Sequence, residues 1–192
     1  MDDAFSRCFE RRELLADEES YRLQLAHRYA YVLPEQHALE VVRAYSPLVE
    51  LGAGTGYWAY LLRLMGADVI AYDHAPLGGS RPNRYHPDAR PWTEVFYGDA
   101  DVLEDHADRS LFVCWPPRYS AIWDCLRFYK GDVVVYVGDR GTRTADLASL
   151  EDCFALAEAY SVLAMDPAPD ALSELTVWKR RDGVTPVTNL TP

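Results

Sequence analysis

The stretch Val49–Met65 reads V-E-L-G-A-G-T-G-Y-W-A-Y-L-L-R-L-M, and it decides the fold. It begins apolar, passes through three alternating glycines and then becomes amphipathic. Positions 58, 61, 62 and 65 recur at the i, i+3, i+4 and i+7 spacing of one helical face, and Gly66 supplies a helix stop. The pattern predicts a strand, a glycine turn and a helix, with a turn whose backbone can approach a ligand closely.

The spacing of Gly52, Gly54 and Gly56 narrows the class of ligand. The dinucleotide fingerprint is G-x-G-x-x-G, with a pyrophosphate on the helix N-terminus, whereas here the third glycine comes one residue early. Glu50 precedes the turn, and its carboxylate would repel a pyrophosphate but attract a ligand that carries an ammonium group. The sequence also lacks the phosphate-loop motif G-x-x-x-x-G-K-[ST].

The motif E-x-G-x-G-x-G after a strand resembles motif I of the Rossmann-like (class I) S-adenosylmethionine (SAM) methyltransferases. The resemblance covers roughly residues 34–180. It implies a three-layer, doubly wound α/β fold, with a mostly parallel seven-stranded sheet in the order 3-2-1-4-5-7-6 and an antiparallel last strand. It also implies that S-adenosyl-L-methionine is the cofactor, with its aminocarboxypropyl chain held by Glu50, Gly52, Ala53, Gly54 and Gly56.

Two further acids fit the nucleoside part of such a ligand. Asp73 follows the predicted strand 68–72 and comes about 20 residues after the first glycine, where an acid binds ribose hydroxyls. NAD and SAM share that ribose, so Asp73 favours adenosine binding without choosing between them. The alternative is a turn aspartate before His74 and Pro76. After the predicted strand 93–97, the resemblance implies that Asp99 and the Ala100 N–H bind adenine. A helix N-cap is an alternative role for Asp99.

Residues 74–92 are predicted to form a long irregular loop, because four prolines and two glycines discourage a helix. A long irregular connection in a compact domain is often functional. His74 and His86 fall near the ligand end of this loop. His74 is assigned to the cofactor site, and both histidines are interpreted as polar loop residues rather than as bases.

The predicted catalytic residues are Trp115, Asp139 and Arg140, which follow the fourth and fifth strands. Trp115-Pro-Pro is similar to the [DNS]-P-P-[YFW] motif of amino-methyltransferases, but its first residue is not polar and Arg118 follows it, which weakens any inference of N-methylation. Trp115 is either a wall near the sulfonium or an ordinary buried tryptophan. Asp139 and Arg140 either orient the nucleophile and a substrate carboxylate or form a turn ion pair.

The chain divides into a predicted helical cap or lid over residues 1–46, a SAM-binding catalytic domain over residues 47–181 and a tail over residues 182–192. Helices before motif I often form a lid in the family, so Tyr29, Tyr31 and Gln36 are candidates for the pocket wall. The remaining expected elements are a helix opened by Pro34, helices over 119–126 and 147–154, and strands over 111–115, 132–137, 159–164 and 174–179.

Composition and charge limit the partners. The 192-residue chain has a net charge of −11 and no stripe of Lys or Arg, which repels phosphate backbones, so no nucleic acid is expected as a substrate. No apolar run reaches the roughly 18 residues that a bilayer requires, and the N-terminus lacks a secretory signal. A cytoplasmic protein with no membrane partner is therefore expected. The four cysteines show no metal-ligand spacing, and no metal is expected.

The sequence therefore predicts an enzyme that transfers the SAM methyl group to a nucleophile on a small molecule, at an N, O or C acceptor. Compactness leaves little room for a separate substrate domain, and a homodimer is possible. Two alternatives keep the same cofactor: an enzyme that transfers or cyclises its aminocarboxypropyl group, and a catalytically silent SAM-binding subunit. A nicotinamide oxidoreductase is disfavoured by the glycine spacing and Glu50.

Overall fold

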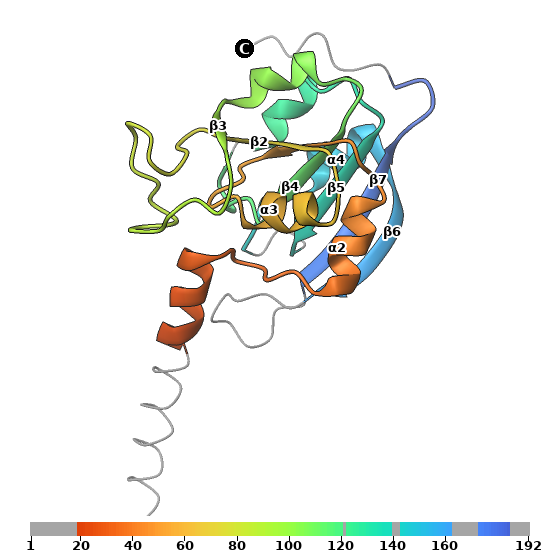
Figure 1. The fold of residues 1–192 in the computed structure, drawn as a ribbon. Coiled ribbons are helices and arrows are strands. Elements are labelled where there is room, and N and C mark those ends of the chain that lie inside the picture. Colours follow the sequence, from red (N-terminus) through yellow and green to blue (C-terminus); the bar gives the residue numbers. More distant parts are fainter. Residues whose placement is uncertain (1–18, 121, 140–142, 163–172, 185–192) are drawn as a thin grey trace, which may run out of the picture.

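A seven-stranded sheet in the order β3-β2-β1-β4-β5-β7-β6 runs through the chain (Figure 1). The computed structural model describes residues 19–120, 122–139, 143–162 and 173–184. The first five strands pair in parallel, and β7 is antiparallel to both β5 and β6, so the predicted order and the antiparallel ending are confirmed. The strands are β1 Leu48–Leu51, β2 Val69–Asp73, β3 Phe96–Tyr97, β4 Ser110–Cys114, β5 Val133–Gly138, β6 Phe154–Val162 and β7 Ser173–Arg180.

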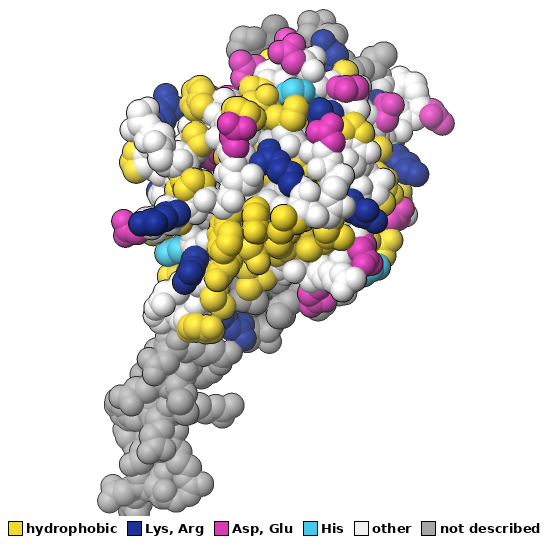
Figure 2. Space-filling view, in the orientation of Figure 1, with side chains coloured by type: hydrophobic (Ala, Val, Ile, Leu, Met, Phe, Trp, Pro, Cys, Tyr) yellow, Lys and Arg dark blue, Asp and Glu magenta, His cyan; other side chains and the backbone are white. Residues whose placement is uncertain are grey.

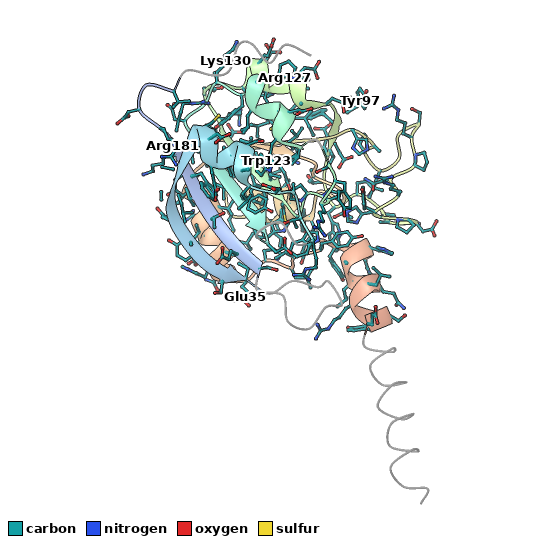
Figure 3. All side chains as sticks on the ribbon, turned by 180° about the vertical axis from the view of Figure 1, so that it is seen from behind. Glu35, Tyr97, Trp123, Arg127, Lys130 and Arg181 are labelled. Atoms are coloured by element: carbon teal, nitrogen blue, oxygen red, sulfur yellow. The ribbon has the colours of Figure 1, made fainter. Side chains whose placement is uncertain are left out.

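Helices cover both faces of the sheet, which gives the predicted three layers. Helices α2 (Gln36–Arg43) and α3 (Tyr57–Leu64) pack on one face together with Leu48, and the other face carries Val49 and Leu51. That second face, seen from behind in Figure 3 with Trp123 labelled, is covered by the 3-10 helices η1 (Ala100–Asp105) and η2 (Ile122–Arg127) and by α4 (Ala148–Cys153). All four residues of β1 are buried, as an inner parallel strand requires.

Four elements differ from the sequence-based expectation. The strand predicted over 93–97 is only the two-residue β3, Phe96–Tyr97. The helix predicted over 119–126 is the short 3-10 helix η2, because Tyr119, counted on its apolar face, is exposed beside two prolines. Strand β6 begins at Phe154 instead of residue 159, because Phe154 pairs with Arg180 of β7 and is buried there. Helix α2 begins two residues after Pro34, with Glu35 as its N-cap.

The N-terminal segment forms a helix over residues 19–28, which stands at one end of the molecule in Figure 1 and is joined to α2 by residues 29–35. Residues 1–18 of the predicted cap and residues 185–192 of the predicted tail lie outside the described residues. Among the helices that the structure describes, none combines the length and the apolar character that crossing a membrane requires.

Trp58 anchors α3 to both the sheet and the N-terminal segment, because its ring packs against Phe112 and its indole N–H donates to the Val32 carbonyl at 3.0 Å. Trp58→Ala is expected to lower the free energy of unfolding by about 3–5 kcal/mol in urea denaturation. Leu64→Ala, on the same helix but 67% exposed, is the control and should change it by less than about 0.5 kcal/mol. Equal effects of the two substitutions would contradict the described packing of α3.

Candidate cofactor site

The glycine turn follows β1 and is tied to the end of β2 by its own backbone. Gly52, Gly54 and Gly56 all have positive φ angles, of 77°, 56° and 74°, a conformation that glycine adopts without strain. The N–H groups of Gly52 and Ala53 both donate to the Tyr72 carbonyl, at 2.9 and 3.0 Å, and the Gly56 N–H donates to the Ala53 carbonyl at 2.8 Å. Because protein oxygens accept these N–H groups, they do not form a cradle for a pyrophosphate.

Asp73, at the end of β2, completes this arrangement. Its Oδ2 accepts the Gly54 N–H and its Oδ1 accepts the Ala75 N–H, each at 2.8 Å. Asp73, which is predicted to bind the ribose, is therefore also the residue that fixes the glycine turn. Each carboxylate oxygen has two lone pairs, so each keeps one for a further donor such as a ribose hydroxyl. The neighbouring His74 is 59% exposed, with Nδ1 3.5 Å from Asp73 Oδ1.

Glu50 has a buried carboxyl oxygen for which the described residues provide no hydrogen-bond partner. Side chains alternate along β1, so Glu50 lies on the α3 face, where it is 1% exposed and its Oε2 accepts no hydrogen bond. Burial raises the pKa of this carboxyl from 4.5 to about 8, against the opposing charge of Arg63. Arg63 does not pair with it, since its guanidinium donates to the Val69 and Glu94 carbonyls and the Thr93 hydroxyl.

An unsatisfied buried acceptor of this kind costs about 1–3 kcal/mol of stability. A cationic donor beside Glu50 would recover that cost and would favour the ionised carboxylate. The group that fits is an ammonium, either in direct contact or through one bridging water. This residue therefore suits the amino-acid end of the cofactor that the sequence predicts.

The glycine turn is open at one end and covered at the other. A Cβ built on Gly52 would meet nothing within 4 Å, whereas one on Gly54 would lie 2.5 Å from His86 Nε2. A Cβ on Gly56 would lie 2.8 Å from Val95 Cγ2. A ligand can therefore approach the turn at Gly52 and Ala53, which is the end nearest Glu50.

The predicted adenine segment follows β3, next to Asp73 in the sheet. Asp73 pairs with Tyr97, and its carbonyl accepts the Gly98 N–H at 3.2 Å. Asp99 is exposed and precedes η1, but its side chain makes no capping hydrogen bond, so the N-cap alternative is not supported. Its Oδ2 accepts the Tyr97 hydroxyl at 3.3 Å, and Ala100 begins η1. Tyr97 is labelled near the β3 edge in Figure 3.

The predicted catalytic residues after β4 and β5 form a second group at the same edge of the sheet. Trp115 has a positive φ of 52°, which is strained for a bulky residue, and its N–H donates to the Val137 carbonyl at 2.7 Å. The guanidinium of Arg143 lies 5.1 Å from the centre of the Trp115 ring, and its Nε lies 3.1 Å from Asp139 Oδ2. Arg140 lies outside the described residues.

Asp139 is engaged in holding its own loop. Its carboxylate is buried and accepts the backbone N–H groups of Arg143 and Thr144, with the Thr144 hydroxyl 2.7 Å from Oδ1. These hydrogen bonds hold the carboxylate against the backbone of its own loop. Its catalytic role stays a prediction, and positioning Arg143 against Trp115 is the role that its contacts support.

Sequence reasoning missed two side chains of the site. Arg143 was not singled out, although its place four residues after Asp139 is a pairing signal. His86 was interpreted as a polar loop residue, but it is 8% exposed and contacts the glycine turn. Of the predicted wall residues, Tyr31 contacts the His86 ring, whereas Gln36 is exposed and donates to Glu40 within α2. Among the residues that the structure describes, no group of three or more His, Cys, Asp or Glu is placed to hold a metal ion.

Comparisons with known proteins connect this arrangement to a fold. No family model matches the sequence, and no curated protein matches it. A candidate methyltransferase from Haloferax volcanii, solved in complex with the Trm112 methyltransferase activator, is similar in structure, with 16% identity, a TM-score of 0.51, and 88% of this chain and 94% of that chain covered. The chain has the Rossmann-like methyltransferase fold.

Two further solved structures were matched in the comparison. An uncharacterized protein from Listeria monocytogenes serotype 4b has 12% identity and a TM-score of 0.50, with 82% of this chain and 71% of that chain covered. The Pyrococcus abyssi tRNA (uracil-54, C5)-methyltransferase, in complex with S-adenosyl-L-homocysteine, has 14% identity and a TM-score of 0.45. The alignment covers 74% of this chain but only 37% of that enzyme's length.

These comparisons correct the expected partners. The net charge of −11 was taken to exclude a nucleic-acid substrate, but the solved structures that the comparison returned include a tRNA methyltransferase. The Haloferax volcanii structure contains a protein activator as well. The expectation that nucleic acid is not a substrate is therefore wrong. The total charge of a chain does not describe the charge around one site.

The raised pKa of Glu50 predicts a pH dependence of stability. The unfolded carboxyl loses its proton near pH 4.5 and the folded one near pH 8, so the free energy of unfolding falls between these values. Glu50→Gln removes this loss, and the variant should gain about 2–4 kcal/mol relative to the parent between pH 5 and pH 8. Urea denaturation at pH 5 and pH 8 measures the free energy of unfolding of both proteins, with the exposed Glu104→Gln variant as the control. A pH-independent difference between parent and Glu50→Gln would contradict the assignment.

Proposed function

We propose that this chain binds SAM at the carboxyl ends of β1, β2 and β3 and transfers its methyl group to an acceptor. The observation that carries the proposal is the orphaned Oε2 of Glu50, which lies beside a glycine turn that is open at Gly52. The methyltransferase fold supports it, and so does the use of the turn's N–H groups within the protein, which disfavours a dinucleotide phosphate.

The residues divide the binding task among them. Glu50 would accept from the ammonium group of the cofactor, and the remaining lone pairs of Asp73 would accept from ribose hydroxyls. Asp99 and Ala100 would bind adenine, since the Asp99 carboxylate is exposed. When bound, SAM supplies a methyl group that its sulfonium already activates. The chain's contribution is therefore to orient the two reactants and to exclude water.

The acceptor would lie near the ends of β4 and β5. Trp115 offers an aromatic face there, and Arg143 adds a positive charge close to that ring. Such a wall suits a planar or an anionic acceptor, and both a small molecule and an RNA base meet that description. The sequence favours a small molecule as the acceptor. The proposed location of the protein is the cytoplasm.

One observation favours the alternative of a catalytically silent SAM-binding subunit. Apolar side chains gather on the surface over α3 in Figure 2, where Leu64 is exposed and Tyr57, Tyr60 and Leu61 are partly exposed. A contiguous apolar surface of this kind often marks a protein interface. Under this alternative the chain binds SAM but turns over no acceptor by itself.

Calorimetric titration with SAM tests the proposal. The parent should bind one equivalent, and Glu50→Gln should bind at least about tenfold more weakly, because it loses a charged hydrogen bond. Exposed Glu104→Gln should bind as the parent does. A parent protein that gives no binding would contradict the proposal.

Product analysis separates the remaining functions. The protein is incubated with SAM and either total RNA or a small-molecule extract, and the products are identified by mass spectrometry. S-adenosylhomocysteine formed with one of the two pools supports methyl transfer and gives the acceptor class. Methylthioadenosine indicates transfer or cyclisation of the aminocarboxypropyl group. Binding without either product supports the silent subunit.

A further inference from the structure

His86 sits directly on the glycine turn, although it comes from the irregular loop over residues 74–92. A Cβ on Gly54 would lie 2.5 Å from its Nε2 and 2.9 Å from its Cδ2. The imidazole is therefore in contact with the Gly54 backbone, and no ligand atom fits between them. The Gly54 N–H is meanwhile accepted by Asp73, so this N–H is not available to a ligand.

The orientation of the His86 ring is fixed by the N-terminal segment. Its Nδ1 lies 3.0 Å from the His27 carbonyl, which only accepts, so Nδ1 carries the proton and Nε2 is the bare nitrogen that faces the turn. The ring of Tyr31 meets it edge-on, with the centroids 5.7 Å apart. Burial lowers the pKa of His86, which keeps the imidazole neutral.

A second set of contacts joins the same two segments. The indole N–H of Trp92 donates to the Arg28 carbonyl at 2.9 Å, and its ring stacks on Tyr29 with the centroids 5.1 Å apart. The Tyr31 hydroxyl donates to the Tyr85 carbonyl at 3.3 Å. The Thr55 hydroxyl, within the glycine turn, donates to the Tyr29 carbonyl. Residues 27–31 are thus bonded both to the loop and to the turn.

We infer that His86 is a positioning residue of the proposed cofactor site. Its ring forms a wall that covers the glycine turn at Gly54 and confines the cofactor to the open side at Gly52 and Ala53, next to Glu50. Through Nδ1 the same ring couples residues 27–31 to the glycine turn, so the wall and the N-terminal segment hold each other in place. The inference rests on the proposed function, because it assigns His86 to the SAM site.

The experiment compares the parent with His86→Ala, His86→Gln and His86→Phe. S-adenosylhomocysteine is the probe, and its affinity and dissociation rate are measured together with hydrogen exchange of the free proteins. His86→Ala should weaken binding and speed dissociation about tenfold, since it removes the wall and one hydrogen bond. The amides of residues 27–31 should also exchange faster in the free variant.

The other two variants separate the two parts of the role. Glutamine keeps a donor for the His27 carbonyl but not the ring, and phenylalanine keeps the ring but not the donor. Only His86→Gln should retain slow exchange at residues 27–31, and both should bind more weakly than the parent. His37→Ala is the matched control, because His37 also meets a tyrosine ring edge-on, at 5.2 Å from Tyr160, but lies on α2.

The outcomes are distinct. A parent that binds, with His86 variants that bind and release the probe within about twofold of it, overturns the inference and leaves the proposed function intact. The inference is also wrong if His37→Ala weakens binding as much as His86→Ala does. A parent that does not bind the probe overturns the proposed function and this inference together.

Discussion

Two backbone N–H groups, those of Gly54 and Ala75, converge on the Asp73 carboxylate, and the candidate site depends on that convergence. The pair of bonds fixes the glycine turn after β1 to the loop that leaves β2. Both strands are inner and parallel, so their ends cannot move apart without breaking the sheet. A rigid support of this kind is what a precise binding site requires, because loose placement of the groups loses binding energy. Asp73 therefore shapes the site before any ligand arrives.

Glu50, in contrast to Asp73, lowers the stability of the folded protein. A buried carboxyl whose pKa is about 8 lowers stability at neutral pH, and an apolar residue at the same place on β1 would remove that cost. Proteins tolerate such groups mainly where function uses them. The neighbouring charge of Asp73 raises the pKa of Glu50 further, so a cation placed between the two carboxyls would be stabilised by both.

The sheet was predictable from the sequence, whereas the contacts that close the glycine turn were not. The assignment of Glu50, Asp73 and Asp99 to the cofactor stays a prediction. The strand order was implied by the family resemblance at the motif around Gly52, and the inner strands were indicated by buried apolar and β-branched runs, which are local signals. The position of His86 depends on a carbonyl 59 residues away, and such a long-range contact leaves no pattern in a single sequence. The predictions for η2 and for the start of β6 were wrong because strand pairing and burial outweighed the periodicity of the sequence. The prediction that nucleic acid is not a substrate was wrong because the net charge describes the whole chain and not the surface around one site.

A crystal structure with S-adenosyl-L-homocysteine tests the central claim most directly. The account predicts that the amino group lies within hydrogen-bond distance of Glu50 Oε2, directly or through one water, with the ribose on Asp73. It also predicts that the ligand contacts the turn at Gly52 and Ala53 and leaves the His86 ring on Gly54. A nucleoside bound away from this edge of the sheet, or a Glu50 side chain that pairs with a protein cation in the complex, would contradict it.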